Sequence, residues 1–230
     1  MFDRSVLRWG GLAGMVGAAV GSVANLMHPR GDEVASAQGI VEMAAGSDIW
    51  ILDHYLIAWS IALGGFGLIA LAKSLAQEPA RSWGSIAIAF TIGSVVVGYL
   101  LAAIDGTALK DAADNGGPEA LAVAQVSAGL FTAMMGSLFG VAPILIGIAL
   151  LSTSQYPKWL GTLAVASGAV GVFTSSYQYL VGYEPVVGNY LFTLGSFGTT
   201  IVLFAGGWFL WKGEYAGVAN EPIAGGRPVI

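Results

Sequence analysis

The chain has 230 residues, of which 56% are hydrophobic and only 10% are charged, and its mean hydropathy is +0.74. Because soluble domains carry about 25% charged residues, this composition excludes a water-soluble globular domain and indicates an integral membrane protein. The net charge of −5 excludes a nucleic-acid partner, which would require basic patches. The absence of cysteine from the chain excludes disulfides, thiolate metal sites, iron–sulfur clusters and covalently attached c-type haem.

The first apolar segment covers residues 7–27 and is long enough to cross a bilayer as a helix. Arg4 and Arg8 precede it, as in a signal peptide, but the apolar run is longer than that of a usual signal peptide, so we expect a retained helix. Its glycines form two small-xxx-small pairs, at positions 10 and 14 and at positions 17 and 21. This pattern predicts a helix face that packs closely against another helix of the same chain.

Five further apolar segments, over residues 49–73, 84–104, 119–151, 159–179 and 189–211, complete a transmembrane domain that we assign to residues 1–213. Between the first two spans, apolar residues recur at helical spacing over 34–45 and predict a short helix at the surface. The stretch 106–117 is rich in Asp and Gly and is typical of a solvated turn. Pro143 predicts a bend in the long fourth span, and 214–230 is expected to be a polar cytoplasmic tail. The predicted fold is an all-α bundle of six transmembrane helices.

Six spans place both termini on one side of the membrane, and the basic residues indicate which side. Only Arg30 and Lys110 fall on the side opposite the termini, while seven basic residues fall on the terminal side: Arg4, Arg8, Lys73, Arg81, Lys158, Lys212 and Arg227. The positive-inside rule therefore predicts that both termini are cytoplasmic. On the opposite side, Trp50 and Tyr190 are expected in the outer aromatic belt.

Polar side chains within the spans gather at the outer end of the predicted bundle. The four ionisable ones are His28, Asp53, His54 and Asp105, and we take them as candidate metal ligands. Amide and phenol side chains at similar depth are expected to line a ligand site beside them: Asn25, Tyr55, Gln125, Tyr177, Gln178 and Asn189. Since polar groups avoid lipid, all of these side chains are expected to face the interior of the bundle.

Three interpretations of this cluster remain open. The first is structural: the polar groups hold helices in order, and the protein is an accessory subunit of a larger membrane complex or a homo-oligomer. The second is a cofactor site, either a transition metal such as zinc, copper or iron or a haem b with His28 and His54 as axial ligands. The third is a site for a small amphipathic ligand or a small transporter. A proton relay across the membrane would need ionisable groups in the inner half of the bundle, where the spans hold almost none.

Hydrolytic catalysis has little support in the sequence. No GxSxG motif surrounds any serine. Asp53 and His54 are neighbours in a predicted helix, so their side chains point about 100° apart and the acid does not orient the imidazole. The sequence therefore favours a protein that is not an enzyme, although it does not decide the question.

The pairs His28-Pro29 and Trp50-x-x-x-His54 resemble a loose set of bacterial multi-pass membrane proteins. In those proteins a His-Pro pair ends the first helix and a Trp-x-x-x-His motif opens the second. The resemblance covers roughly the first third of the chain. It implies a protein of the bacterial inner membrane whose two histidines belong together, and it implies no activity.

Overall fold

The structure is a computed structural model that describes residues 3–29, 36–182, 184 and 186–213. Every regular element in these ranges is helical: α1 (Arg4–Met27), α2 (Ala37–Gly46), α3 (Trp50–Lys73), α4 (Ala80–Ala103), η2 (Ile104–Leu109), α5 (Lys110–Asn115), α6 (Glu119–Gly136), η3 (Ser137–Val141), α7 (Ala142–Leu151), α8 (Lys158–Val181), η4 (Val186–Leu191) and α9 (Phe192–Lys212). The three η segments are π-helical turns. Six of the resulting continuous helices are long and apolar enough to cross a membrane, which confirms the predicted all-α bundle of six spans. The predicted tail, 214–230, lies outside the described residues.

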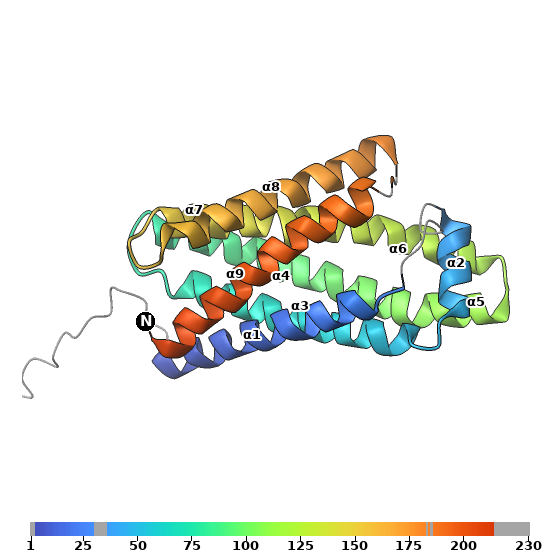
Figure 1. Ribbon diagram of the computed structural model, residues 1–230, viewed down its shortest axis with the longest axis horizontal. Helices are drawn as coiled ribbons and strands as arrows, with labels where there is room; N and C mark the ends of the chain where they lie inside the picture. Colours follow the sequence, from blue (N-terminus) through green and yellow to red (C-terminus); the bar gives the residue numbers. More distant parts are fainter. Residues whose placement is uncertain (1–2, 30–35, 183, 185, 214–230) are drawn as a thin grey trace, which may run out of the picture.

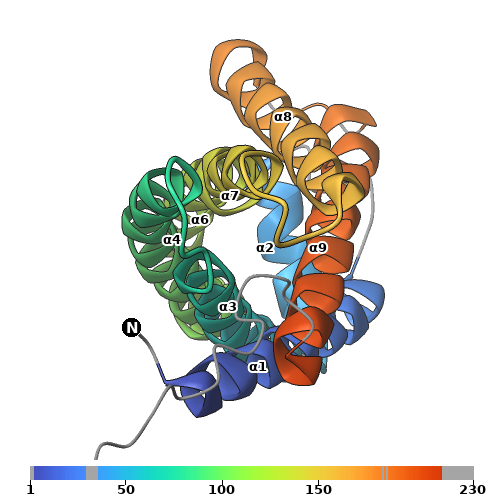
Figure 2. The same ribbon diagram turned by 90° about the vertical axis from the view of Figure 1, so that its left-hand side faces the viewer.

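The six long helices form a closed ring in chain order. Each packs against the next, and α9 returns to pack against α1, as the end-on view in Figure 2 shows. The start of α1 and the end of α9 lie at the same end of the bundle, which we call the terminal end (Figure 1). The short helix α2 lies across the opposite end, which we call the distal end (Figure 1).

Closely packed small residues join α1 to α3. A methyl group added to Gly14 or Gly17 would meet backbone atoms of Gly67 or Gly64, at 3.2 and 2.5 Å respectively. Toward the distal end the same seam continues where Gly21 faces Ser60. The expected close packing of this glycine face within the chain is confirmed. The two helices are antiparallel, so later residues of α1 contact earlier residues of α3. The seam therefore ends with His28 opposite Asp53.

The third span is longer than predicted. The turn expected over 106–117 is wrong for most of its length, because the helix continues from α4 through the π-helical η2 and α5 to Asn115. The turn itself is confined to the residues after Asn115, where Gly116 adopts a positive φ of 67° that ends the helix. Gly106, Asp111 and Asp114 are therefore helical, and η2 places Asp105 beside His54.

The fourth span has the irregularity predicted near Pro143. The π-helical turn η3 separates α6 from α7, and Pro143 lies at the start of α7. Since proline has no amide hydrogen, it cannot donate to the preceding turn, and the backbone hydrogen bonds rearrange there.

The short surface helix predicted for 34–45 is present as α2, and residues 34 and 35 lie outside the described ranges. Ser36 begins α2 by accepting a hydrogen bond from the amide of Gly39 at 3.0 Å. Ala44 is fully buried and packs in one apolar cluster with Trp50 and Leu109. The helix therefore covers the distal end directly beside the polar cluster.

Glu78 caps the first turn of α4 at the terminal end. Its carboxylate accepts hydrogen bonds from the hydroxyl of Ser82 at 2.7 Å and from Arg81 Nε at 2.8 Å. These hydrogen bonds, with Ser82 first and Arg81 second, hold the pKa of Glu78 below its ordinary value of 4.5.

Candidate metal centre

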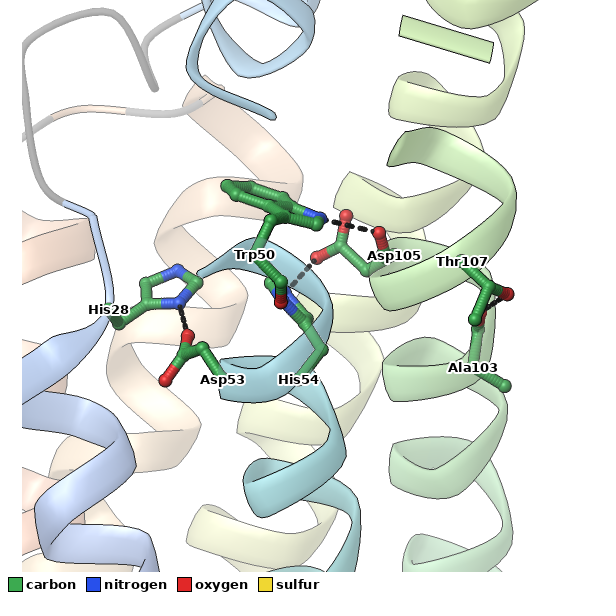
Figure 3. A network of polar contacts seen from close by, with 7 residues as sticks. All are labelled: His28, Trp50, Asp53, His54, Ala103, Asp105 and Thr107. Carbon is green, nitrogen blue, oxygen red and sulfur yellow. Dashed lines mark hydrogen bonds and ion pairs between the residues drawn. The ribbon is translucent and has the colours of Figure 1, made fainter. Parts of the chain in front are cut away.

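The first pair of the polar cluster joins α1 to α3. His28 ends α1, where Pro29 follows and the helix cannot continue. Its Nδ1 lies 2.5 Å from Oδ2 of Asp53 on the first turn of α3 (Figure 3). The Asp53 side chain is fully buried and that of His28 is 31% exposed. The glycine seam brings α1 and α3 together. Its register therefore decides that Asp53 pairs with His28 and not with its neighbour His54.

The second pair joins α3 to η2. His54 Nδ1 lies 2.8 Å from the carbonyl oxygen of Trp50, one turn earlier in the helix. Because a carbonyl oxygen only accepts, Nδ1 carries a hydrogen and donates it. The other ring nitrogen, Nε2, is thereby turned toward Oδ2 of Asp105, at 3.2 Å (Figure 3). The His54 imidazole is therefore oriented by the backbone of its own helix, and its Nε2 faces the carboxylate of Asp105 on the neighbouring helix.

Trp50 holds this arrangement together, and its expected position in the outer aromatic belt is wrong. The side chain is only 1% exposed, and its Nε1 donates to the carbonyl oxygen of Asp105 at 2.7 Å. The indole also packs against both imidazoles, with ring centroids 4.6 Å from His54 and 5.8 Å from His28. The Trp-x-x-x-His spacing is the signal for this role, since it places the two rings one helical turn apart.

Gly106 allows η2 to approach α3. A methyl group added to this glycine would stand 2.6 Å from Cβ of His54, well inside van der Waals contact. Only glycine therefore permits the close approach of the two helices that brings Asp105 to His54. Sequence reasoning did not single out this residue, although the Asp-Gly pair at 105–106 was visible.

Two carboxylate oxygens of the cluster have unused hydrogen-bonding capacity. Oδ1 of Asp53 and Oδ1 of Asp105 are both buried, and neither has a hydrogen-bond partner among the described residues. Ligand atoms of His28, Asp53 and His54 lie within 4.8 Å of one another, a grouping that could hold a metal ion. Imidazole nitrogens and carboxylate oxygens are the donor set that zinc, iron and related divalent metals accept.

Two of the other predicted lining residues have exposed side chains. Tyr55 is 58% exposed, and Gln125 is also exposed, on α6. Asn25 is half-buried on α1, one turn before His28. The side chain of Asn189 lies outside what the structure describes.

On α8, Tyr177 is half-buried and Gln178 is buried. The Gln178 amide oxygen accepts a hydrogen bond from Thr132 of α6 at 3.5 Å. The structure thus brings together His28, Asp53, His54 and Asp105, while Gln178 belongs to the α6–α8 contact.

The rest of the described interior contains no second charged cluster. Asp53 and His54 are the only Asp, Glu, His, Lys or Arg side chains among the described residues that are buried; the other buried polar side chains there carry hydroxyls or amides. A proton relay through the terminal half would need further ionisable groups. The ring centroids of His28 and His54 are 5.2 Å apart, too close for a porphyrin to lie between the two imidazoles.

No protein-family model, no curated protein and no solved structure matches this chain. Its function is therefore inferred from the six apolar helices and from the His/Asp cluster.

Proposed function

We propose that this multi-pass membrane protein binds a divalent transition-metal ion at the distal end of the bundle, through His28, Asp53, His54 and Asp105. The basic residues at the terminal end favour a cytoplasmic location for both termini. The metal site then faces the outside of a bacterial inner membrane. Under this proposal the protein is a metal-binding membrane protein. The positions of the His and Asp side chains give less support to a haem site or to a site for an amphipathic ligand.

The observation that carries the proposal is the pair of buried, unpartnered oxygens on Asp53 and Asp105. A buried carboxylate oxygen without a donor costs free energy, and a cation bound beside it removes that cost. In a purely structural network both of these oxygens stay without a partner, and most buried polar groups in proteins have one.

The donor atoms are close to the spacing that an ion needs. Ligands of a tetrahedral zinc ion at about 2.0–2.1 Å from the metal are ~3.3 Å apart, and the ligand atoms of His28, Asp53 and His54 are at most 4.8 Å apart. Of these three residues His28 is the most exposed, so its side chain has the most freedom to move toward an ion. The hydrogen bond from His54 Nδ1 to the Trp50 carbonyl fixes the imidazole so that Nε2 is the ligating atom, as in many metal sites.

The experiment is elemental analysis with an optical spectrum on gently purified protein, followed by titration with Zn²⁺. We expect stoichiometric metal, no haem absorption band, and loss of at least tenfold in metal affinity in His54→Asn and in Asp105→Asn, roughly the range for lost ligands and their partners. Asp111→Asn is the matched control, because Asp111 is an exposed acid of α5 at the same end. Protein that neither retains nor binds zinc, iron, copper or manganese would contradict the proposal, as would equal zinc affinity in His54→Asn.

A structural role is the second candidate, and one observation favours it. The two His–Asp pairs join α1, α3 and η2 through direct contacts, so they hold three helices together even with no ion bound. This is the role of an accessory subunit in a larger complex. Under it, His54→Asn is tolerated, because a neutral hydrogen-bonding side chain replaces another, and the purified protein contains no metal.

A further inference from the structure

A basic cleft lies at the terminal end, far from the His/Asp cluster. It has a volume of about 490 Å³ and is formed by the start of α1 and the end of α9. Three cationic side chains line it, those of Arg4, Arg8 and Lys212, and none of the described lining residues is acidic. The nearest acid of α1, Asp3, accepts a hydrogen bond from the amide of Ser5 at 2.9 Å and so caps the helix.

Two tryptophans flank the basic cleft. Trp9 is 63% exposed and Trp211 is 39% exposed, and their rings meet edge to face with centroids 6.2 Å apart. Exposed tryptophans beside cationic residues at the end of a membrane helix are typical of the level of the lipid headgroups. The cleft is therefore placed where phosphate groups of the surrounding lipid lie.

A second, apolar groove lies further along the same two helices. It has a volume of about 350 Å³ and is lined by Ala18, Ala19 and Ser22 of α1 and by Ile201, Phe204 and Ala205 of α9, among others. Arg8 and Ala19 are about three helical turns apart, and Phe204 and Trp211 about two, so each pair lies on one face of its helix. The basic cleft and the apolar groove thus lie on the same face of α1 and on the same face of α9, along what we call the α1–α9 seam.

The length of this seam matches one leaflet. Eleven residues separate Arg8 from Ala19, which is about 16 Å along a helix. Half of the hydrocarbon core of a bilayer is roughly 15 Å. A molecule with a negative headgroup in the basic cleft would have its acyl chain in the apolar groove.

We propose that the α1–α9 seam binds an anionic phospholipid from the leaflet on the terminal side. The phosphate lies among Arg4, Arg8 and Lys212, and one acyl chain lies against Ala19 and Phe204. The positive charge of the basic cleft favours an anionic headgroup. The apolar groove favours a phospholipid with an acyl chain over inorganic phosphate. This proposal does not depend on the metal site, because the two sites are at opposite ends of the bundle.

The test is native mass spectrometry of the delipidated full-length protein with dioleoyl phosphatidylglycerol or dioleoyl phosphatidylcholine added in matched amounts. We expect selective retention of phosphatidylglycerol, and retention about thirtyfold weaker in the double variant Arg8→Gln with Lys212→Gln, because each basic residue near a membrane surface contributes to the attraction of anionic lipid. The control double variant Lys73→Gln with Arg81→Gln removes the same charge from the terminal end outside the cleft and is expected to retain phosphatidylglycerol normally.

Ala19→Phe tests the acyl-chain part without changing any charge. It is expected to weaken retention of phosphatidylglycerol and to leave any binding of inorganic phosphate unchanged. Equal retention of the two lipids by the unmodified protein, or loss of selectivity in the control double variant, would overturn the proposal. Full retention of phosphatidylglycerol in Ala19→Phe would overturn it as well, since the cleft would then bind phosphate without the chain.

Discussion

Gly106 and His54 touch across the contact between η2 and α3, and a methyl group added to the glycine would stand 2.6 Å from Cβ of His54. Gly106→Ala is therefore expected to push η2 away and to separate Asp105 from His54. We expect at least a tenfold loss of metal affinity, roughly the loss seen when a metal ligand loses its hydrogen-bond partner. The unfolded fraction is expected to stay close to that of the unmodified protein. Gly129→Ala is the control, because nothing lies within 4 Å of its added methyl group. Unchanged zinc binding in Gly106→Ala, measured by titration, would show that the close approach is not needed.

His28→Ala is expected to destabilise the protein more than the loss of an exposed histidine would. Asp53 is fully buried, and His28 is its hydrogen-bond partner among the described residues. Removing the hydrogen-bond partner of a buried polar group costs about 1–3 kcal/mol, because that group is left unsatisfied. The measurement is the free energy of unfolding in mixed micelles of detergent and denaturing detergent. The double variant His28→Ala with Asp53→Ala should recover part of the loss, and a double variant less stable than the sum of the two single ones would contradict this account.

Trp50→Phe keeps an aromatic ring beside both imidazoles and removes the indole donor. The Asp105 carbonyl oxygen then loses the hydrogen bond from Nε1 that it accepts at 2.7 Å. We expect a loss of about 1–2 kcal/mol in the free energy of unfolding, the usual cost of a buried group left without its partner. Trp83→Phe serves for comparison, since Trp83 is 36% exposed and should change stability little. Equal effects of the two substitutions would mean that Trp50 contributes only packing.

Gly67→Ala tests the seam between α1 and α3. The added methyl group would stand 2.4 Å from Cα of Gly14, so the two helices must move apart and the His28–Asp53 pair at the end of the seam is strained with them. Gly93→Ala is matched in chemistry, but its methyl group meets nothing within 4 Å. We expect Gly67→Ala to lower the thermal midpoint in detergent and Gly93→Ala to leave it unchanged or raise it, because alanine has about 1 kcal/mol better helix propensity than glycine. Similar midpoints for the two variants would rule out the seam as a close contact.

Glu78 predicts a pH dependence at the terminal end. Its pKa is lowered from 4.5 by hydrogen bonds from Ser82 and Arg81. A carboxyl group with a lower pKa in the folded state stabilises that state above the pKa of the unfolded chain, and the contribution is lost as the pH falls through the folded value. The thermal midpoints of the unmodified protein and of Glu78→Gln should therefore differ at pH 7 and converge below pH ~4. A difference that stays constant between pH 7 and pH 3 would assign the effect of the substitution to something other than the charge.

Sequence reasoning predicted the membrane architecture because hydrophobicity is a property of local segments. Six apolar runs, too long for anything but bilayer spans, are visible without any knowledge of packing, and all six are present. The burial of Asp53 and His54 was also predictable, since charged side chains avoid lipid and must turn inward; both are buried in the structure.

The pairing within the cluster depended on the tertiary structure. Asp53 and His54 are adjacent in sequence, yet each pairs with a residue from another helix, His28 of α1 and Asp105 of η2. The register of the glycine seam and the close approach at Gly106 decide these partners, and both are contacts between segments that lie far apart in the chain.

The limits of the third span show the same division. The sequence by itself determined that the apolar run ends near Asp105, because the charge and the glycines that follow are local features. Only the tertiary structure decided that the helix continues to Asn115, since Leu109 and Ala113 are buried in one apolar cluster with Ala44 of α2 and Trp50. Burial against another helix outweighs weak local helix propensity. The local sequence does not show which distant part of the chain will bury a segment.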